Sequence, residues 1–589
     1  MIVIDIWMIT KSDISRFFDQ EAEAEKKHWE ATMSLPLKER IRKRRAIKDV
    51  YIDKSYRETS SEHHPLLKLR MSVNLSDFKE GDSLLLHKDD SATGIKCTLY
   101  SFNGDDEIIV DVYPALPSNL ENYLDTPLVL DKNLVDLRQY VYNPFLYELP
   151  TSQAFWQNHL INTCPKPSFE NREECKADLD GFLEYLNSKL LPSQYTAAVN
   201  SISAKDYYLI QGPPGTGKSF VLGWIILEEL LLFKHKVIVI GPNHMAINNT
   251  LVQVFKMVPK LTNLILKVGQ PYNAPDIETE QEGEKYTIRN FWGVDGYDAS
   301  NQDGGWVIGI TPHALHSSRG DGLKCDTLVI DEAGQMTIPL AMMGMIRAKK
   351  VILAGDHKQL PPIIASEEID DEMKRSIFQV LMTDENCTML DVSFRMCEPI
   401  CKFVSDLFYD GKLKSNKPGF GDRIICKDPL YSFSAPIVIH HVDDNGEQTS
   451  DKEAEFIANT INNFIKLGLP ADEVAVLSPF RAQAAAIRRH IRKQKEIDED
   501  TRKLIVSDTI DKMQGQEREV IIYSMVSGNF EYMTEMAEFL YNPRKINVAF
   551  SRAKYKLIIV GNLDKLKRLP GIEYEHIHKM LQSELAVFI

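Results

Sequence analysis

The chain has 589 residues, 43% of them hydrophobic and 26% charged, and its formal net charge is −15. This length predicts several domains, because one hydrophobic core rarely grows beyond about 250–300 residues. The composition is that of an ordinary globular protein, and no apolar run approaches the length of a membrane-spanning helix. The acidic balance argues against nucleic-acid binding over the whole surface, but it leaves room for a locally basic channel.

The eight cysteines are scattered and form no C-x-x-C pair, so we expect neither a zinc site nor an iron–sulfur cluster. Such cysteine usage fits a reducing compartment, and we expect a cytoplasmic protein. The apolar residues 1–10 lack a basic leader and a small-residue cleavage site. We therefore interpret them as the start of a strand or helix and not as a signal peptide.

Residues 1–66 predict a helical stalk region, because a highly charged, helix-like pattern runs from residue 11 to about 48. The basic run at 38–45 is typical of a solvated helix face, and a nucleic-acid contact is the alternative. Short apolar stretches over residues 67–150 then predict a small antiparallel β-barrel as an accessory domain. The predicted barrel strands are residues 67–71, 83–87, 97–100 and 108–112, with a hairpin-turn signal at Asn103-Gly104.

A helical connector is expected over residues 151–190, and strands then alternate with helices over residues 191–382. This alternation predicts a mostly parallel sheet covered by helices. A polar, acidic stretch at 270–305 interrupts the domain as a small insertion, and a second α/β domain follows over residues 383–589. The predicted strands are residues 237–240, 306–310, 327–330 and 351–354 in the first domain and 474–477, 520–523 and 557–560 in the second.

Residues 207–220 predict a strand, a glycine-rich turn and a helix, which is the setting of a phosphate-binding loop. The glycines let backbone N–H groups point at a phosphate, and the helix directs its positive end at the same anion. Lys218 would reach the β- and γ-phosphates, and the Ser219 hydroxyl would take a Mg²⁺ position. The nucleotide would be held by Gly212, Pro213, Pro214, Gly215, Thr216, Gly217, Lys218 and Ser219.

Two acids and an amide follow later strands of the same domain. Asp331 is placed to hold Mg²⁺, and Glu332 is placed to polarise the attacking water. For these acids alone, a solvated strand end is the alternative. Gln359 follows the next strand and is the candidate sensor of the γ-phosphate.

Phosphoryl transfer also needs cations that meet the charge developing at the γ-phosphate. Arg395 and Arg552 lie near element boundaries in the second α/β domain. If both face the phosphate loop across a cleft, ATP joins the two domains and its hydrolysis releases them. A surface salt bridge is the alternative for either arginine.

The ordered motifs resemble those of superfamily 1 helicases of the 1B branch. The chain is similar to the nonsense-mediated-decay helicase and to the helicase half of replication nuclease-helicases, over residues 191–589. It lacks the zinc module and the nuclease domain of longer relatives, and Gly334 and Phe394 differ from the commoner residues at these positions. The motifs are Ser193-Gln194, GPPGTGKS, Gly241-Pro242-Asn243-His244, DEAGQ, GDHKQLPP, SFRM, Thr509-x-x-x-x-Gln514-Gly515-Gln516-Glu517 and VAFSRAK.

The resemblance implies two tandem RecA-like domains, ATP and Mg²⁺ as cofactors, and a role for each matching residue. Gln194 would read the adenine, Glu517 would contact the ribose, and Gln359 would link hydrolysis to movement. Arg395 and Arg552 would meet the γ-phosphate, while Ser219 and Asp331 would hold the metal. The single-strand track would be lined by Pro242, Asn243, Thr311, Pro312, Pro479 and Thr509.

We expect an ATP-dependent helicase that translocates on single-stranded nucleic acid, 5′→3′ by resemblance. DNA is favoured over RNA by overall similarity to the nuclease-helicases. An RNA helicase and a clamp that remodels protein–nucleic acid complexes are alternatives that keep the ATPase. A nucleotide-dependent switch without nucleic acid is a further alternative, but it has no need of Arg552.

Overall fold

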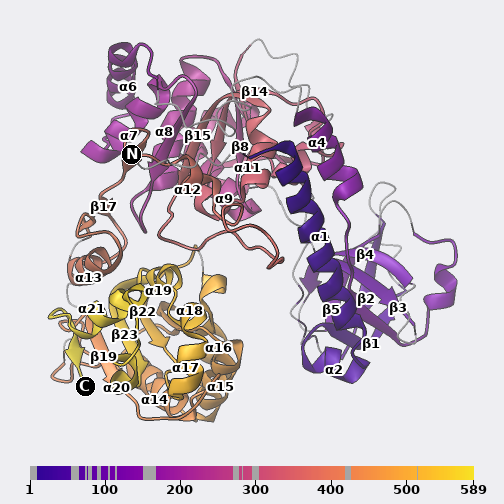
Figure 1. The fold of residues 1–589 in the computed structure, drawn as a ribbon. Coiled ribbons are helices and arrows are strands. Elements are labelled where there is room, and N and C mark those ends of the chain that lie inside the picture. The colour runs from indigo at the N-terminus through magenta and orange to yellow at the C-terminus, as the bar shows by residue number, and fades with distance from the viewer. Residues whose placement is uncertain are drawn as a thin grey trace.

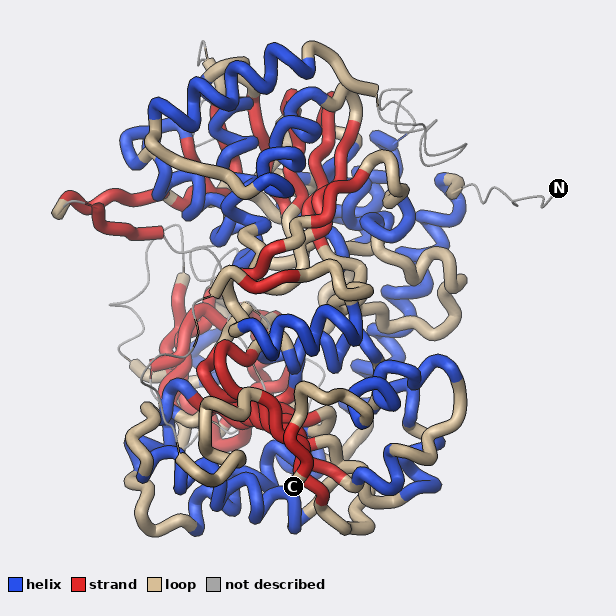
Figure 2. The backbone as a smooth tube through the Cα atoms, turned by 90° about the vertical axis from the view of Figure 1, so that its left-hand side faces the viewer, coloured by secondary structure: helices blue, strands red, loops and turns tan. Residues whose placement is uncertain are grey.

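The computed structural model describes residues 9–589 except 55–64, 73, 75, 77, 79–81, 89–93, 104–105, 113–115, 150–167, 270–276, 282, 295–303, 418, 420–425 and 514. In this part of the chain, two α/β domains lie one above the other, and a long helix leads from the first of them to a β-barrel at their side (Figure 1). Strands of both α/β domains are flanked by helices, and the C-terminus lies in the second domain (Figure 2). None of the described helices has the length and apolarity to cross a bilayer.

Helix α1 (Lys11–Met33) forms the stalk and begins with a capping box. Its first half packs on the first α/β domain, where Arg16 Nη2 lies 2.8 Å from Asp370 Oδ2. The Phe18 ring stacks on Tyr142 of η2 (Arg138–Tyr142) with 3.9 Å between ring centroids. Its second half reaches the barrel, where Trp29 Nε1 donates a hydrogen bond of 2.8 Å to the Lys132 carbonyl. Shorter elements complete this region: α2 (Leu37–Arg42), η1 (Leu120–Tyr123), η2 (Arg138–Tyr142) and α4 (Asn143–Glu148).

Six strands close into an antiparallel barrel in the order β1-β2-β5-β4-β3-β6. The predicted barrel is confirmed, and the β4–β5 hairpin lies where the turn was predicted, although Gly104 itself is outside the described residues. The strands are β1 (Ala46–Ile52), β2 (Leu66–Arg70), β3 (Ser83–His87), β4 (Gly94–Asn103), β5 (Glu107–Asp111) and β6 (Leu128–Lys132).

Strand β1 lies inside residues 1–66, where the sequence predicted helix. A register shift between Ile47 and Val50 interrupts the alternation of buried and exposed residues. Asp49 takes a left-handed φ of 53° within this irregular segment. Because the bulge breaks the two-residue period, the strand has no clear signature in the sequence.

The first α/β domain contains an eight-stranded parallel sheet in the order β12-β9-β13-β8-β14-β15-β7-β16. Its strands are β7 (Tyr207–Gln211), β8 (Lys236–Ile240), β9 (Ile265–Val268), β12 (Asn290–Phe291), β13 (Trp306–Gly309), β14 (Cys325–Ile330), β15 (Ala348–Gly355) and β16 (Cys387–Met389). Its helices are α6 (Arg172–Tyr185), α7 (Pro192–Ser203), α8 (Lys218–Leu231), α9 (His244–Met257), η4 (Pro259–Leu264), α10 (Pro312–Leu315), η6 (Ala333–Gln335), α11 (Ile338–Met345) and α12 (Ile377–Leu381).

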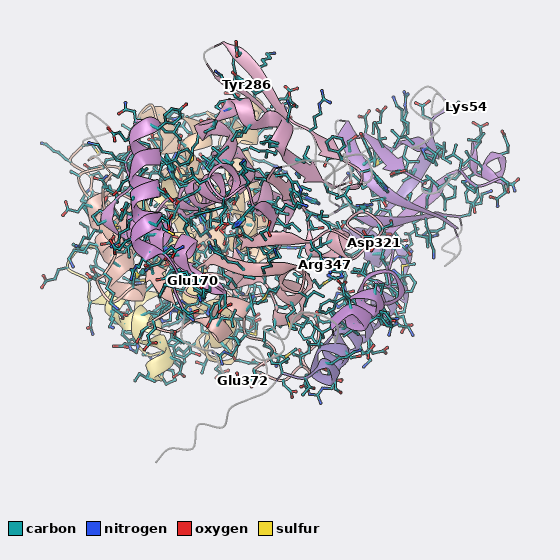
Figure 3. All side chains as sticks on the ribbon, turned by 90° about the horizontal axis from the view of Figure 1, so that it is seen from above. Lys54, Glu170, Tyr286, Asp321, Arg347 and Glu372 are labelled. Atoms are coloured by element: carbon teal, nitrogen blue, oxygen red, sulfur yellow. The ribbon has the colours of Figure 1, made fainter. Side chains whose placement is uncertain are left out.

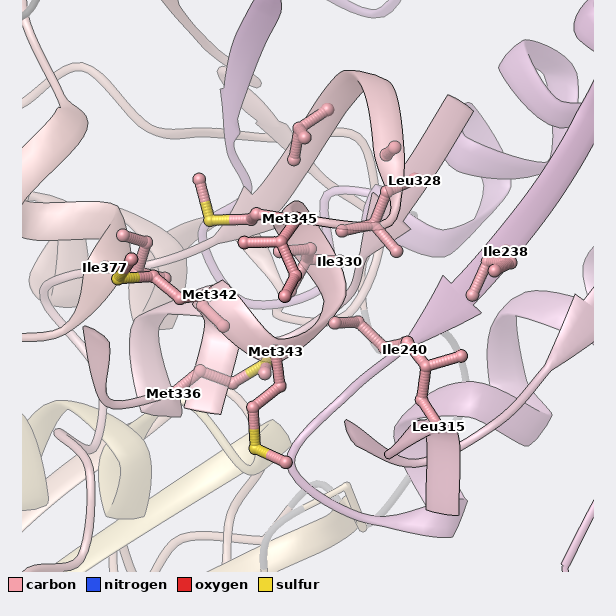
Figure 4. Packing of buried hydrophobic residues seen from close by; sticks show 14 of the residues in the cluster. Ile238, Ile240, Leu315, Leu328, Ile330, Met336, Met342, Met343, Met345 and Ile377 are labelled. Carbon is pink, nitrogen blue, oxygen red and sulfur yellow. The ribbon is translucent and has the colours of Figure 1, made fainter. Parts of the chain in front are cut away.

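Apolar side chains pack on both faces of this sheet, and this packing fixes the positions of the strand ends. On one face, methionines of α11 lie against side chains of β8 and β14, including Ile240 and Ile330 (Figure 4). Burying each such side chain contributes about 1.5–3 kcal/mol. The sheet is therefore a rigid base for the loops at its carboxyl edge, where open α/β sheets place ligands.

The described residues of the insertion predicted at 270–305 include strands, although the sequence showed few helix or strand signals there. Strands β10 (Ile277–Gln281) and β11 (Glu284–Ile288) form an antiparallel hairpin. This hairpin projects from the body of the domain, with Tyr286 on it (Figure 3). Its polar residues are explained by this exposed position, and β12 then returns the chain to the sheet edge.

The second α/β domain has a six-stranded parallel sheet in the order β21-β20-β22-β23-β19-β24. Two RecA-like domains are thus present, as predicted. The first sheet extends to β16, slightly beyond the predicted boundary at residue 382. The strands are β19 (Ile437–His441), β20 (Val474–Ser478), β21 (Val506–Thr509), β22 (Arg518–Ser524), β23 (Ala553–Gly561) and β24 (Val587–Phe588), with a separate pair β17 (Val392–Ser393) and β18 (Lys414–Ser415).

Helices cover both faces of this second sheet and bury its apolar strands. They are α13 (Glu398–Phe408), α14 (Asp451–Lys466), η7 (Ala471–Glu473), α15 (Arg481–Lys493), α16 (Glu499–Leu504), η8 (Ile510–Met513), α17 (Phe530–Glu535), α18 (Ala537–Leu540), α19 (Pro543–Phe550), α20 (Leu563–Leu566), η9 (Ile572–Tyr574) and α21 (Glu575–Leu581).

Candidate active site

The glycine-rich loop joins β7 to α8 in the predicted strand–turn–helix arrangement. Gly215 and Gly217 have φ angles of 73° and 78°, in the left-handed region that favours glycine. A side chain on Gly215 would also collide with Arg395 of the second domain. The loop therefore needs glycine for its own turn and for the close approach of the other domain.

Lys218 at the start of α8 is paired with the two predicted catalytic acids. Its Nζ lies 2.6 Å from Glu332 Oε1 and 3.5 Å from Asp331 Oδ1. Burial opposes the charge on Lys218, but the two carboxylates outweigh burial and raise the pKa of the lysine. The ammonium group in turn lowers the pKa of Glu332 against the effect of burial. Both partners are therefore charged at neutral pH.

Asp331 is held by hydroxyl groups on two helices. Its Oδ2 accepts hydrogen bonds from Ser219 Oγ at 3.1 Å and from Thr250 Oγ1 at 2.8 Å. Hydroxyl and carboxylate oxygens are ligands that Mg²⁺ accepts, and Mg²⁺ typically takes one or two protein ligands plus phosphates and water. Ser219 and Asp331 fit that role, and the described residues contain no cluster of three acidic, histidine or cysteine ligands.

Glu332 has an unusual backbone conformation, with a φ of 55°. A non-glycine residue in this region costs on the order of 1 kcal/mol or more, and such strain concentrates at functional sites. Its second carboxylate oxygen accepts a hydrogen bond of 2.9 Å from Gln335 Nε2. Each carboxylate oxygen of Glu332 therefore has a partner, Lys218 for one and Gln335 for the other, and the two contacts fix the orientation of the side chain.

Gly334 lets the acid motif approach the following strand closely. A Cβ at this position would lie 2.8 Å from the backbone oxygen of Asp356, which is too close for any side chain. The glycine that distinguishes this chain from commoner relatives therefore has a packing role. It holds the loop of Glu332 against the loop that carries Gln359.

A buried hydrogen-bond network connects Gln359 to the second domain. Asp356 Oδ2 accepts hydrogen bonds from Gln359 Nε2 at 2.9 Å and from the Tyr409 hydroxyl at 2.6 Å. Asn547 Nδ2 donates to the Tyr409 hydroxyl at 2.8 Å and to the Lys358 carbonyl at 2.7 Å. Burial and the Asp356 carboxylate raise the pKa of Tyr409 well above its ordinary value, so the phenol keeps its proton.

The second domain contributes the two predicted arginines. Arg395 Nε donates to Glu517 Oε2 at 2.6 Å, and Arg552 Nε donates to the Val548 carbonyl at 3.2 Å. Burial, and then the charge of Arg395, lowers the pKa of Arg552. An added anion would therefore stabilise the charged form of the Arg552 guanidinium.

A cavity of about 430 Å³ brings these groups together across the interface. Glu332 and Gln359 line it with the phosphate loop on one side, and Arg395 and Arg552 line it on the other. The shared cleft that the sequence predicted between the two domains is therefore present. Helix α9 adds a further wall, through Asn249, Val252, Gln253 and Lys256.

The sequence interpretation missed several residues of this site. The residues of the α9 wall are three and four positions apart, which places them on one face of the helix. That spacing could have been recognised in the sequence. Thr250, Tyr409 and Asn547 carried no such signal, because their partners are 53 to 189 residues away in the chain or on another element.

Gln194 and Glu517, which were predicted to contact the adenine and the ribose, are hydrogen-bonded to other groups of the protein. Gln194 accepts from the Leu191 backbone N–H and donates to the Thr216 carbonyl, both at 3.0 Å. It therefore braces the phosphate loop and does not line the cavity. Glu517 is paired with Arg395, so it positions a predicted phosphate ligand.

The predicted track residues lie at the carboxyl ends of neighbouring parallel strands. Pro242 and Asn243 follow β8, and Thr311 and Pro312 follow its neighbour β13. Asn243 and Thr311 also cap the helices α9 and α10. In the second domain, Pro479 follows β20, and Thr509 ends the adjacent β21.

Two family models match the second half of the chain. Both are described as an AAA domain, and they match residues 307–367 and 373–564. An uncharacterised ATP-dependent helicase of Methanocaldococcus jannaschii is 26% identical over 68% of this chain and 73% of its own length. The DNA polymerase alpha-associated DNA helicase A of Schizosaccharomyces pombe is 27% identical over 66% of each chain. Regulator of nonsense transcripts 1 of Dictyostelium discoideum is 27% identical over 65% of this chain and 32% of its own length.

Together with the two RecA-like domains and the shared cleft, these matches indicate an ATP-dependent helicase of superfamily 1. Within that superfamily, the matches indicate the family that includes regulator of nonsense transcripts 1. The chain spans from about a third to about three quarters of the length of these three relatives.

Proposed function

We propose that the protein is a motor that uses ATP to move 5′→3′ along single-stranded DNA and to unwind duplexes. The observation that carries this proposal is the cavity in which the phosphate loop faces Arg395 and Arg552 of the other domain. A nucleotide in this cavity would bind both domains at once. Its hydrolysis would weaken their contact, and alternate closure and opening would move the protein along a strand.

Lys218 would change its partner when the nucleotide enters. Its ammonium group neutralises Glu332 at 2.6 Å, and a polyphosphate would compete for that charge. Glu332, still oriented by Gln335, would then be available to accept a proton from the attacking water. ATP supplies the bond that is cleaved, and Mg²⁺ held by Ser219 and Asp331 would offset its negative charge.

Arg395 and Arg552 would meet the charge that develops on the γ-phosphate, since arginine is suited to such contacts. Gln359 lines the same cavity and is bonded to Asp356, which Tyr409 of the second domain also contacts. A change at the γ-phosphate would therefore pass through these hydrogen bonds to the second domain. This network gives the proposed coupling a physical route.

The nucleic acid would lie across the strand ends that carry the predicted track residues of both domains. Binding through backbone phosphates and base stacking depends little on the nucleotide sequence and weakens as the salt concentration rises. The preference for DNA draws on likeness to relatives named as DNA helicases, helicase A among them. An RNA helicase or a remodelling clamp would use the same cavity and track.

A cytoplasmic location is part of the proposal. It is supported by the free state of the cysteines in the described part of the chain, several of which are buried. Burial raises the pKa of the Cys97 thiol to about 12 and that of Cys401 to about 12, which keeps both thiols unreactive.

The test is an ATPase titration with matched DNA and RNA oligonucleotides, followed by strand displacement from duplexes with a 5′ or a 3′ overhang. We expect stimulation that is stronger with DNA, and unwinding only from the 5′ overhang. Stronger stimulation by RNA would reverse the substrate assignment, and stimulation without unwinding would favour the remodelling clamp. No stimulation by either strand would contradict the motor and favour a nucleotide switch.

A further inference from the structure

We propose that a basic groove between the barrel and the second domain binds the phosphate backbone of a single strand beyond the predicted track. One wall is residues 42–45, which are the last residue of α2 and the turn that leads to β1, and the other wall is helix α15. The groove has a volume of about 660 Å³. This inference rests on the proposed function and adds a second grip on the same strand, outside the two RecA-like domains.

The groove concentrates positive charge in a chain whose net charge is −15. The turn presents four consecutive cations: Arg42, Lys43, Arg44 and Arg45. Helix α15 presents Arg481, Arg488 and Arg492, which are seven and four residues apart and thus share one face. Asp508 is the one acid among the described residues that line the groove, and Glu39 pairs with Arg42 beside it.

The walls leave space for a ligand. Ala482 and Ala485 separate the arginines on α15, and both lie on the groove. Long cationic side chains therefore surround a floor of small residues. Such a surface suits the phosphate backbone of a nucleic acid, because each phosphate is neutralised by a nearby cation and a shallow groove is enough to hold it.

The turn is fixed in place by a buried ion pair that precedes it. Arg40 is fully buried, and its Nε and Nη2 each lie 3.0 Å from a carboxylate oxygen of Asp131 in β6. Its Nη1 donates to the Leu35 carbonyl at 2.7 Å, and its own carbonyl accepts from the Arg45 backbone N–H at 2.8 Å. The cations are thus pre-arranged on the barrel, which lowers the entropy cost of binding.

The groove continues the predicted track. Arg481 follows Pro479 by two residues, and Asp508 immediately precedes Thr509. Figure 1 shows α2 at the lower end of the barrel, on the side of the second domain that carries α15 and α16. A strand that leaves the ends of β20 and β21 would therefore meet the groove next.

The test compares the wild-type protein with a variant that removes one cation from each wall, Lys43→Gln with Arg492→Gln. A matched control, Lys38→Gln with Arg489→Gln, removes exposed cations of α2 and α15 that lie outside the groove. Fluorescence anisotropy with oligodeoxythymidylates of increasing length gives affinities at several salt concentrations. Thermal unfolding checks that all three proteins fold alike.

In the wild type and the control, we expect affinity to rise once the oligonucleotide is long enough to reach the groove. The groove variant should lose this gain. The slope of its plot of log affinity against log salt concentration should become less steep by about 1.4, since each of the two lost phosphate contacts with a single strand contributes about 0.7 to the slope. The shortest oligonucleotide that stimulates the ATPase should bind all three proteins equally.

Identical length and salt dependence in the groove variant and the control would overturn the groove while leaving the proposed function intact. Failure of the wild type to bind any oligonucleotide would overturn both proposals. If the groove variant bound nucleic acid normally but lost binding of polyglutamate, the groove would be a site for acidic protein, and the inference would be wrong.

Discussion

The two RecA-like domains share one strand order but differ in the chemistry of their loops. Without its edge strands β12 and β9, the first sheet has the order β13-β8-β14-β15-β7-β16. The second sheet has the order β21-β20-β22-β23-β19-β24. Numbered along the chain within each domain, both orders are 3-2-4-5-1-6. The loops can therefore be compared strand by strand, which separates what the scaffold provides from what the side chains add.

The first strand of each domain leads into a very different turn. After β7, the chain forms the glycine-rich loop that ends at Lys218. After β19, the corresponding segment contains Asp443 and Asp444, and Ser450 caps α14 while donating a hydrogen bond of 2.6 Å to Asp444 Oδ2. Two carboxylates at this place would repel a phosphate. The comparison therefore supports a single nucleotide site, at the glycine-rich loop of the first domain.

The fourth strand of each domain shows the same backbone with different side chains. Glu332 and Val526 are each the second residue after β14 and β22, and their φ angles are 55° and 50°. In the second domain, the Val526 N–H donates to Glu453 at 3.2 Å. The left-handed turn is thus a feature of the scaffold, and only the first domain places an acid, the proposed base Glu332, on it.

The largest effect is expected from Lys218→Ala, because this lysine faces both acids and the predicted phosphate position. ATP turnover should fall by at least about 10³-fold. Lys452 near the start of the corresponding helix α14 is the matched control, since its Nζ donates to the Asp443 carbonyl. Lys452→Ala should change turnover by less than about twofold. Equal losses in the two variants would contradict the division between the domains.

Glu332→Gln should retain ATP binding but lower turnover by roughly 10²–10³-fold, because an amide accepts no proton from water. The substitution keeps the size of the side chain and a hydrogen bond to Lys218. Single-turnover hydrolysis and equilibrium nucleotide binding separate the two effects. Normal hydrolysis by this variant would show that Glu332 is not the base.

Arg552→Ala should slow turnover by about 10²-fold without unfolding the protein, because Arg552 lines the cavity from the second domain and is proposed to meet the γ-phosphate. Arg568 of the same domain packs over the Phe530 ring and is the control, since it lies away from the cavity. Steady-state kinetics and thermal unfolding give the two readouts. Unchanged kinetics in Arg552→Ala would remove the evidence for catalysis shared between domains.

Tyr409→Phe should reduce nucleic-acid-stimulated turnover by about tenfold, which corresponds to the loss of one buried hydrogen bond to a charged group. Affinity for ATP should stay the same, because Tyr409 does not line the cavity. Tyr523→Phe is the control, since that buried hydroxyl has no hydrogen-bond partner among the described residues. If both variants behave alike, the Asp356–Tyr409–Asn547 network does not couple the domains.

The smallest effect concerns the stability of the first domain. Glu228 in α8 is fully buried and its carboxylate has no hydrogen-bond partner in the described part of the chain; burial followed by the charge of Glu229 raises its pKa to about 8. Between pH 4.5 and 8 the folded state keeps a proton that the unfolded state releases, so stability falls as pH rises. Glu228→Gln should remove this dependence and raise stability at pH 8 by about 1–2 kcal/mol. Thermal unfolding that retains the same pH slope in the variant would contradict this assignment.

The sequence predicted the elements whose signals are local. The phosphate loop needs only a strand, a glycine turn and a helix in succession, and the buried strands β8, β14 and β15 are continuous apolar runs. These predictions were confirmed. The cleft between the domains was expected from the resemblance of the motifs to those of helicases, because the spacing of Arg395 and Arg552 along the chain does not show it.

Long-range contacts could not be read from the sequence in the same way. The pairing of Glu517 with Arg395 and of Tyr409 with Asp356 joins residues 122 and 53 positions apart. Strand β1 was missed because its bulge breaks the two-residue period. In each case the deciding interaction is tertiary, and local propensity does not report it.

The central claim is that one nucleotide is sensed by both domains through its γ-phosphate. The most direct measurement is the ratio of ADP to non-hydrolysable ATP-analogue dissociation constants, by calorimetry, in the wild type and in Arg395→Ala with Arg552→Ala. We predict that the wild type binds the analogue about tenfold or more tightly than ADP, and that the ratio falls close to one in the variant. An unchanged ratio would show that the second domain does not contact the γ-phosphate, which would contradict the account.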